Sequence, residues 1–247
     1  MTQLIDIIAR LRKECPWDRA QTHESLAAPL IEEAYEAVEA IETQNYPELK
    51  KELGDLLLHV LFHADLAREE GHFTLDDVVQ AECDKLIYRH PHVFGTTEVH
   101  SADDVSRNWE QLKRKETGRT SILDGVPTSL PSLQRATRIQ EKASKVGFDW
   151  DNKESVIEKV REEFEEFITA TTDTEREEEF GDLLFSLVNF SRHQKIEAER
   201  ALRAATIKFD KRFRQVEQLV EASRKPWNEY TLEELDQFWN KAKEIKN

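Results

Sequence analysis

Two pairs of acidic residues stand close together in the second half of the sequence, Glu163 with Glu166 and Glu179 with Asp182. Residues three apart on an α-helix lie on neighbouring turns of one face, so each pair can present two carboxylates to the same site. Two such helices packed together would gather four carboxylates, which repel one another unless a cation lies between them. Oxygen ligands without cysteine or histidine favour a hard ion, so the spacing predicts a Mg²⁺ or Mn²⁺ site.

A solvated helix face is the alternative interpretation, because charged residues make up 34% of the chain. The recurrence of the motif argues against it. Glu-Glu-x-x-Glu followed by Glu-x-Gly-Asp-Leu-Leu occurs at residues 32–57 and again at 162–184. Each copy carries a glycine inside a predicted helix, Gly54 or Gly181, at a cost of roughly 1 kcal/mol relative to alanine. Such a cost indicates close approach of a neighbouring helix or a ligand.

Helical periodicity runs through most of the chain. Apolar residues recur at intervals of three and four, and only seven glycines and seven prolines occur among 247 residues. The sequence therefore predicts an all-α fold, and the repeat predicts two tandem helical bundle domains. Breaker residues are densest between about residues 91 and 131, which places an N-terminal domain at 1–95, a linker at 96–130 and a C-terminal domain at 131–247.

Composition narrows the classes of partner. With a formal net charge of −15, the chain should repel nucleic-acid polymers and anionic membranes, whereas a small phosphate ligand held through a divalent cation is compatible with it. Two cysteines, Cys15 and Cys83, are too few for a disulfide framework. The N-terminal residues lack the unbroken apolar run of a signal peptide or a membrane span. These features predict a cytoplasmic protein with no membrane partner.

One amide side chain extends the second acidic motif. Asn189 follows Asp182 by two helical turns and so lies nearly in line with it. Its amide can donate to and accept from a sugar or a base held beside the metal. Phe62 occupies the matching position in the first copy and cannot make such bonds.

Two cations also repeat in the sequence. Lys208 and Arg212 lie four residues apart beside an apolar stripe, as Lys85 and Arg89 do in the first half. Such cations can hold phosphate oxygens, arginine as a fork and lysine as a point charge. The alternative for them is an ordinary surface pair.

At these residues the sequence resembles the MazG nucleoside triphosphate pyrophosphohydrolases, within the all-α NTP pyrophosphatase superfamily. The segments CPWDRAQTHESL, DKLIYRHPHVFG and LDGVPTSLPSLQRATRIQEKASKVGFDWDN also look like this family, so the resemblance covers nearly the whole chain. The family motif occurs twice, first as Glu32, Glu33, Glu36, Glu52 and Asp55, and then as Glu162, Glu163, Glu166, Glu179 and Asp182.

The resemblance implies Mg²⁺-dependent hydrolysis of nucleoside triphosphates between the α and β phosphates, with loose base selectivity, to a nucleoside monophosphate and pyrophosphate. It also implies a homodimer in which the second half of each chain is active and the first is an inactive or regulatory site. By resemblance, Lys208 and Arg212 hold the triphosphate and Trp239 lies against the base. Arg176 stands where some relatives carry a lysine ahead of Glu-x-x-Asp, and it completes the expected substrate-binding set.

The mechanism expected from these residues is metal-assisted hydrolysis, in which the attacking water needs a base. Glu162 and Glu178 both adjoin the metal ligands, and the sequence does not choose between them. The competing hypothesis is a non-catalytic helical module that binds metal and nucleotide for regulation. A regulatory protein partner is not identified by any motif.

Overall fold

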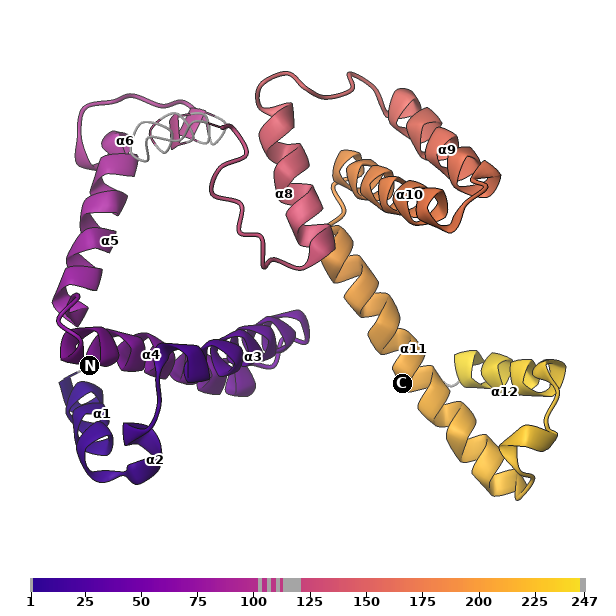
Figure 1. Cartoon of the computed structure of the whole chain (residues 1–247), viewed down its shortest axis with the longest axis horizontal. Helices are drawn as coiled ribbons and strands as arrows, with labels where there is room; N and C mark the ends of the chain where they lie inside the picture. The colour runs from indigo at the N-terminus through magenta and orange to yellow at the C-terminus, as the bar shows by residue number, and fades with distance from the viewer. Residues whose placement is uncertain (1, 102–103, 106–107, 110–111, 113–120, 245–247) are drawn as a thin grey trace. The chain divides into compact units, whose positions relative to one another are not determined.

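The computed structural model describes residues 2–101, 104–105, 108–109, 112 and 121–244 (Figure 1). The described residues form helices and no strand, which confirms the all-α prediction. The chain divides into two compact units, Met1–Gly118 and Arg119–Asn247, and each unit contains one copy of the acidic motif. The predicted linker at 96–130 spans this division, and several of its residues, 113–120 among them, lie outside the described part of the chain, as do the last three residues of the predicted C-terminal domain.

The first unit is built around one pair of long helices. Its helices are α1 (Thr2–Glu14), α2 (Pro16–Arg19), α3 (His23–Glu42), α4 (Tyr46–Glu69), α5 (Leu75–Arg89) and α6 (Pro91–Phe94). Helices α3 and α4 pack along each other, and α1 packs against α4. The buried apolar residues of this unit include Ile8, Leu61 and Phe62, which join α1 to α4. This core holds the α3–α4 pair, which carries the first acidic motif.

The second unit contains α8 (Ser132–Ser144), α9 (Lys153–Thr169), α10 (Asp173–His193), α11 (Ala198–Ser223), the 3₁₀ turn η1 (Trp227–Glu229) and α12 (Leu232–Glu244). Helices α9 and α10 pack along each other, and α8 packs against both α10 and α11. Farther along the chain, α12 folds back onto α11 (Figure 1). Val216 and Val220 of α11 are buried there against Ala242, with Phe238 and Trp239 at the edge.

Side-chain caps determine where the second acidic helices begin. The Asn152 side chain accepts a hydrogen bond from the backbone N–H of Ser155 at 2.8 Å, which starts α9. Helix α10 starts with a reciprocal capping box between Thr172 and Glu175. Hydrogen bonds from Thr171 and Thr172 to the Glu175 carboxylate lower its pKa to about 2. Glu175 therefore stays ionised in its cap, and each cap contributes about 1 kcal/mol to helix stability.

Gly54 and Gly181 lie inside α4 and α10. A Cβ atom at either position would meet no atom within 4 Å among the described residues. The expectation that a neighbouring helix approaches these glycines is therefore wrong within the single chain. The other expectation for these glycines, close approach of a ligand, stays a prediction.

Large apolar side chains remain exposed along the α9–α10 pair. They are Phe164, Ile168, Phe180, Leu184, Phe185 and Leu187. Contiguous exposed apolar side chains are typical of surfaces that bind another molecule. Among the described residues, no helix is long and apolar enough to cross a membrane.

Candidate active site

Three carboxylates of the second acidic motif converge between α9 and α10. Oxygen atoms of Glu163, Glu166 and Glu179 all lie within 4.8 Å of one another. Glu163 is buried and Glu179 is half-buried, because the apolar faces of the two helices pack beside them. The predicted fourth ligand, Asp182, is exposed and lies outside this group. The structure thus brings together three of the four predicted metal ligands.

The first acidic motif forms the same arrangement. Oxygen atoms of Glu33, Glu36 and Glu52 lie within 4.8 Å of one another, and Asp55 lies outside the group as Asp182 does. Burial, reinforced by the nearby carboxyl groups of Glu48, Glu36 and Glu33, raises the pKa of Glu52 to about 7. A carboxyl group with this pKa is about half protonated near neutral pH when no cation is bound.

The cluster on α9 and α10 is also electrostatically strained. Burial raises the pKa of Glu179, and the charges of Glu166, Asp182, Glu163 and Glu178 raise it further. A cation relieves this repulsion. Carboxylate oxygens are hard ligands, so the three residues fit a divalent ion of the Mg²⁺ type.

One lysine already neutralises part of the cluster. Lys159, one turn before Glu163 on α9, places its ammonium 2.8 Å from carboxylate oxygens of both Glu162 and Glu163. These hydrogen bonds raise the pKa of Lys159, which keeps it charged. The sequence prediction missed Lys159, although its spacing of four residues from Glu163 is the spacing of a helical ion pair.

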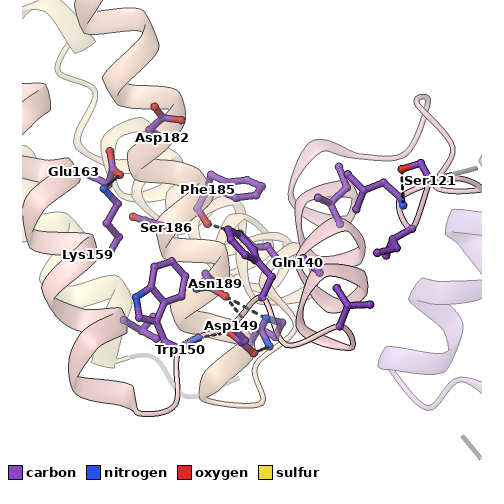
Figure 2. Close-up of a pocket in the computed structure, with 18 residues that line it drawn as sticks. Ser121, Gln140, Asp149, Trp150, Lys159, Glu163, Asp182, Phe185, Ser186 and Asn189 are labelled. Atoms are coloured by element: carbon purple, nitrogen blue, oxygen red, sulfur yellow. Dashed lines mark hydrogen bonds and ion pairs between the residues drawn. The ribbon is translucent and has the colours of Figure 1, made fainter. Parts of the chain in front are cut away.

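A cavity of about 790 Å³ opens beside the cluster and is lined by residues of α8, α9 and α10 and of the segments 121–123 and 146–150. Its volume falls in the range of about 300–1,000 Å³ that is typical of small-molecule sites. Figure 2 shows Glu163 and Asp182 toward one end and Asn189 and Asp149 toward the other. Phe148, Trp150 and Phe185 contribute aromatic surface to its wall. The cavity therefore offers an anionic end and an aromatic, amide-bearing end to one ligand.

Asn189 lines this cavity and is buried, as the sequence predicted for a ligand-binding amide. Its Oδ1 accepts a hydrogen bond from Arg192 Nη2 at 2.7 Å, and Arg192 in turn binds Asp149. Burial alone would raise the pKa of Asp149, but hydrogen bonds from Arg192 and His193 lower it below its ordinary value. Arg192 follows Asn189 by three residues, so the helical spacing could have revealed their contact. Asp149 lies 43 residues away and could not be found that way.

Gln140 is a second buried amide in the cavity wall. Its Nε2 donates to the backbone carbonyl of Phe185 at 2.8 Å, which ties α8 to α10. Its Oε1 is buried and has no hydrogen-bond partner among the described residues. An unpaired buried acceptor costs about 1–3 kcal/mol. The sequence prediction missed this residue because only packing brings α8 against α10.

Four of the predicted substrate-binding residues do not line this cavity. Arg176 is exposed on α10 and pairs with Asp173 at 3.0 Å. Lys208 and Arg212 lie on α11, where the Arg212 guanidinium stands 5.9 Å from the centre of the Trp239 ring. Of the five predicted substrate-binding residues, only Asn189 lines the cavity. Within one chain, Asn189 therefore lies apart from Lys208, Arg212 and Trp239, although the resemblance places them in the same site.

The two predicted general bases flank the cluster. Glu162 is exposed on α9 and binds Lys159, and Glu178 is exposed on α10 next to Glu179. In the first unit, Glu32 is likewise exposed beside Glu33.

The predicted cation pair of the first unit lies at the end of α5. Lys85 is paired with Glu82, and the Arg89 guanidinium lies 5.2 Å from the centre of the Trp109 ring. Neither contact joins these cations to the carboxylates of α3 and α4.

Bulky side chains stand in the first unit where small or polar ones line the cavity of the second. Phe62 and His59 replace Asn189 and Ser186, and both are buried. One cavity of about 90 Å³ lies nearby, lined by residues such as Ile8 and Leu61, and it is too small for a nucleoside. Among the described residues, the first unit therefore repeats the carboxylates of the second, with Phe62 and His59 in place of the Asn189 and Ser186 that line its cavity.

The comparisons with known proteins agree with this repeated architecture. A family model described as the MazG nucleotide pyrophosphohydrolase domain matches the chain twice, at residues 21–94 and 151–217. The chain is 48% identical over 245 residues to the nucleoside triphosphate pyrophosphohydrolase/pyrophosphatase MazG of Thermotoga maritima, with 98% of this chain and 94% of that protein covered.

Two further relatives carry a similar name. The nucleoside triphosphate pyrophosphohydrolase of Escherichia coli K12 is 42% identical over 252 residues, with 98% of this chain and 96% of that protein covered. The one from Mycolicibacterium smegmatis is 34% identical over 242 residues, with 95% of this chain and 64% of that protein covered. With two matches to the family model and relatives of this identity over nearly its full length, the chain belongs to the MazG nucleotide pyrophosphohydrolase family.

Proposed function

We propose that this protein hydrolyses nucleoside triphosphates between the α and β phosphates, releasing a nucleoside monophosphate and pyrophosphate, with broad acceptance of bases. The observation that carries the proposal is the carboxylate cluster of Glu163, Glu166 and Glu179, of which Glu163 lines one end of a nucleoside-sized cavity. The names of the relatives, nucleoside triphosphate pyrophosphohydrolases in both cases, support the same reaction.

The cluster suits Mg²⁺ or Mn²⁺, because its ligands are carboxylate oxygens. We assign Glu163, Glu166 and Glu179 to hold the ion and Asp182, at the same end of the cavity, to complete its shell. When bound, the ion neutralises the polyphosphate and polarises the bond that breaks. Lys159 keeps Glu163 in place by its hydrogen bond and adds a positive charge beside the phosphates.

The proton of the attacking water passes to a carboxylate beside the cluster. Glu162 and Glu178 are the two candidates, because each adjoins a metal ligand and is open to solvent. The ion pair with Lys159 holds Glu162 in one position, whereas the negative charge of Glu178 helps to raise the pKa of Glu179.

We assign catalysis to the second unit. Phe62 and His59 are buried in the first unit at the positions that match Asn189 and Ser186, which line the cavity of the second, so Glu33, Glu36 and Glu52 would form a degenerate, regulatory site. Asn189 of the second unit would bind the nucleoside.

We further propose that the protein acts as a homodimer. The exposed apolar side chains of α9 and α10 supply a surface for a second copy. Lys208, Arg212 and Trp239 are absent from the cavity of their own chain, and a second copy would bring them to it. In that arrangement Lys208 and Arg212 stabilise the charge on the departing pyrophosphate, and Arg176 adds a positive charge at the rim of the cavity.

The two cysteines are unpaired thiols, which suits a protein of the reducing cytoplasm.

A ³¹P NMR spectrum of Mg·ATP incubated with the protein tests the reaction, with the other nucleoside triphosphates in parallel. We expect signals of pyrophosphate and nucleoside monophosphate for the wild-type chain. The Glu163→Gln variant should lose roughly 10²-fold or more in rate. Glu33→Gln, the matched change in the first unit, should retain the rate because it alters only the degenerate site.

Three outcomes would each contradict part of the proposal. Orthophosphate with a nucleoside diphosphate would show cleavage of the other anhydride bond. Unchanged triphosphates across the whole set would contradict hydrolysis and favour the non-catalytic module. A loss of rate in Glu33→Gln equal to that in Glu163→Gln would place the activity in both units.

A further inference from the structure

Arg192 joins two residues at the far end of the cavity from the carboxylate cluster. Its Nη1 lies 2.9 Å from Asp149 Oδ2, and its Nη2 lies 2.5 Å from Asp149 Oδ1. The same guanidinium binds Asn189 Oδ1, from Nη2 at 2.7 Å and from Nε at 3.2 Å. His193 Nε2 is a further neighbour of Asp149, at 3.0 Å. The Arg192 guanidinium is thus bound to the Asp149 carboxylate on one side and donates hydrogen bonds to the Asn189 amide oxygen on the other.

This contact determines which way the Asn189 amide points. A guanidinium can only donate hydrogen bonds, so the atom of Asn189 that faces it must be the oxygen. A flipped amide would place N–H groups against N–H groups and lose both hydrogen bonds. Asn189 is 6% exposed and lines the cavity, so its NH₂ group is the part left to meet a ligand there (Figure 2).

The place of Asn189 in the cavity indicates which part of a nucleotide it meets. Asn189 follows Asp182 by seven residues, about 10.5 Å along the helix axis. Phosphates held at the carboxylate end leave this length for the sugar, with the base beyond it. Trp150 and Phe185 line the cavity and offer apolar surface that suits the flat face of a base.

We propose that Arg192, held by Asp149, is a positioning residue that makes Asn189 an obligate hydrogen-bond donor toward the base. The site then recognises a nucleotide through an acceptor atom on the edge of its base. This inference rests on the proposed function of the same cavity. It adds the chemical feature, an acceptor atom on the base, by which the cavity recognises its substrate.

With the Asn189 NH₂ group as its donor, one site can accept several bases and still require a base. Every common nucleobase carries ring nitrogens or carbonyl oxygens that accept a hydrogen bond. A substrate without the acceptor at the right position leaves the buried NH₂ group unpaired, which weakens binding roughly tenfold or more.

The first test is a double-mutant cycle in the full-length protein, with KM and kcat measured for pyrophosphate release from Mg·ATP. Asn189→Ala and Arg192→Lys should each raise KM about tenfold and leave kcat nearly unchanged. The double variant should be no worse than Asn189→Ala alone, because Arg192 acts through Asn189. Arg214→Lys is the matched control, since Arg214 is exposed on α11 and bound to Asp210, and its KM should equal that of the wild type.

Asn189→Asp keeps an oxygen for Arg192 to bind and replaces the NH₂ donor with a charged carboxylate oxygen that can only accept hydrogen bonds. It should raise KM at least as much as Asn189→Ala does, and a thermal unfolding curve of each variant shows whether the fold is retained. Additive effects of the Asn189 and Arg192 changes, or a fall in kcat without a change in KM, would overturn the positioning role.

The second test identifies the acceptor atom. Adenine accepts hydrogen bonds only at its ring nitrogens, so ATP analogues with C–H in place of N1, N3 or N7 remove the acceptors one at a time. We expect one analogue to raise the wild-type KM about tenfold and to be indistinguishable from ATP for Asn189→Ala. Equal KM values for all four nucleotides would show that Asn189 does not read the base. Pyrophosphate release by the wild-type protein tests the reaction itself, so a failure of the proposed function is distinguishable from a failure of this inference.

Discussion

Glu52 and Glu179 hold equivalent places in the two carboxylate clusters, and burial raises the pKa of both. The repeated spacing of glutamates predicted both clusters, because residues three apart on a helix share a face. What the spacing could not reveal is the burial of Glu52 and of Glu163. Those depend on which side chains of the neighbouring helices pack over each carboxylate.

The raised pKa of Glu52 has a measurable consequence for stability. Without metal, the unfolded carboxyl loses its proton near pH 4.5 and the folded one near pH 7, so the free energy of unfolding should fall as pH rises through this window. Glu52→Gln removes this loss, because glutamine stays neutral. We therefore expect the variant to be more stable than the wild type at pH 8, with a smaller difference at pH 5.

Urea unfolding in EDTA at pH 5, 6.5 and 8 measures this difference. Glu32→Gln is the control, since Glu32 is an exposed neighbour on the same helix pair and should leave the pH dependence unchanged. If Glu52→Gln shifts stability equally at all three pH values, the ionisation of Glu52 is not coupled to folding.

At the level of helices, the local sequence accounts for most of what is observed. The 3.6-residue periodicity predicted the helices, and the capping residues Thr172 and Asn152 stand at the observed starts of α10 and α9. Both are short-range effects that depend on residues within one turn. The expected approach of a neighbouring helix to Gly54 and Gly181 is not found among the described residues, since such approach depends on elements far away in the sequence.

The open space beside Gly54 and Gly181 predicts a gain in stability from alanine. Gly54→Ala and Gly181→Ala should each raise the free energy of unfolding by about 0.5–1 kcal/mol, because alanine has the higher helix propensity and meets no neighbour. Gly147→Ala should instead lower it by about 1 kcal/mol, because Gly147 has a φ of +85° that alanine adopts with strain. Chemical denaturation of the three variants measures this. A loss of stability in Gly181→Ala would reveal a second copy or a ligand packed against α10.

For the whole molecule, the repeat predicted two tandem helical domains, and the structure and the two matches to the family model confirm them. The exact domain limits at residues 95 and 130 stay a prediction. So does the homodimer, which the exposed apolar side chains of the α9–α10 pair and the position of Lys208 outside the cavity both favour.

Mixed dimers test whether a second copy completes the site. Glu163→Gln removes a metal ligand, and Lys208→Ala removes a phosphate cation, so each variant alone should lose roughly 10²-fold in activity. If each cavity takes Lys208 from the partner, a mixed dimer holds one intact site. Random refolding of an equal mixture should then recover roughly one quarter of the wild-type activity. No recovery, with mixed dimers demonstrated by differently tagged chains, would mean that Lys208 serves the cavity of its own chain.

The sequence by itself determined the helices, the two carboxylate clusters and the family, because helix periodicity, caps and side chains three or four residues apart are local features of the chain. Tertiary structure decided the rest of the site. It brought Glu163, Glu166 and Glu179 within 4.8 Å of one another with Asp182 outside this group, and it placed Gln140 against a carbonyl 45 residues away. It also closed the Asp149–Arg192–Asn189 chain of contacts. The physical reason is that the cavity exists only where α8, α9 and α10 pack together, and packing between helices depends on the shapes of whole faces rather than on the spacing within any one of them.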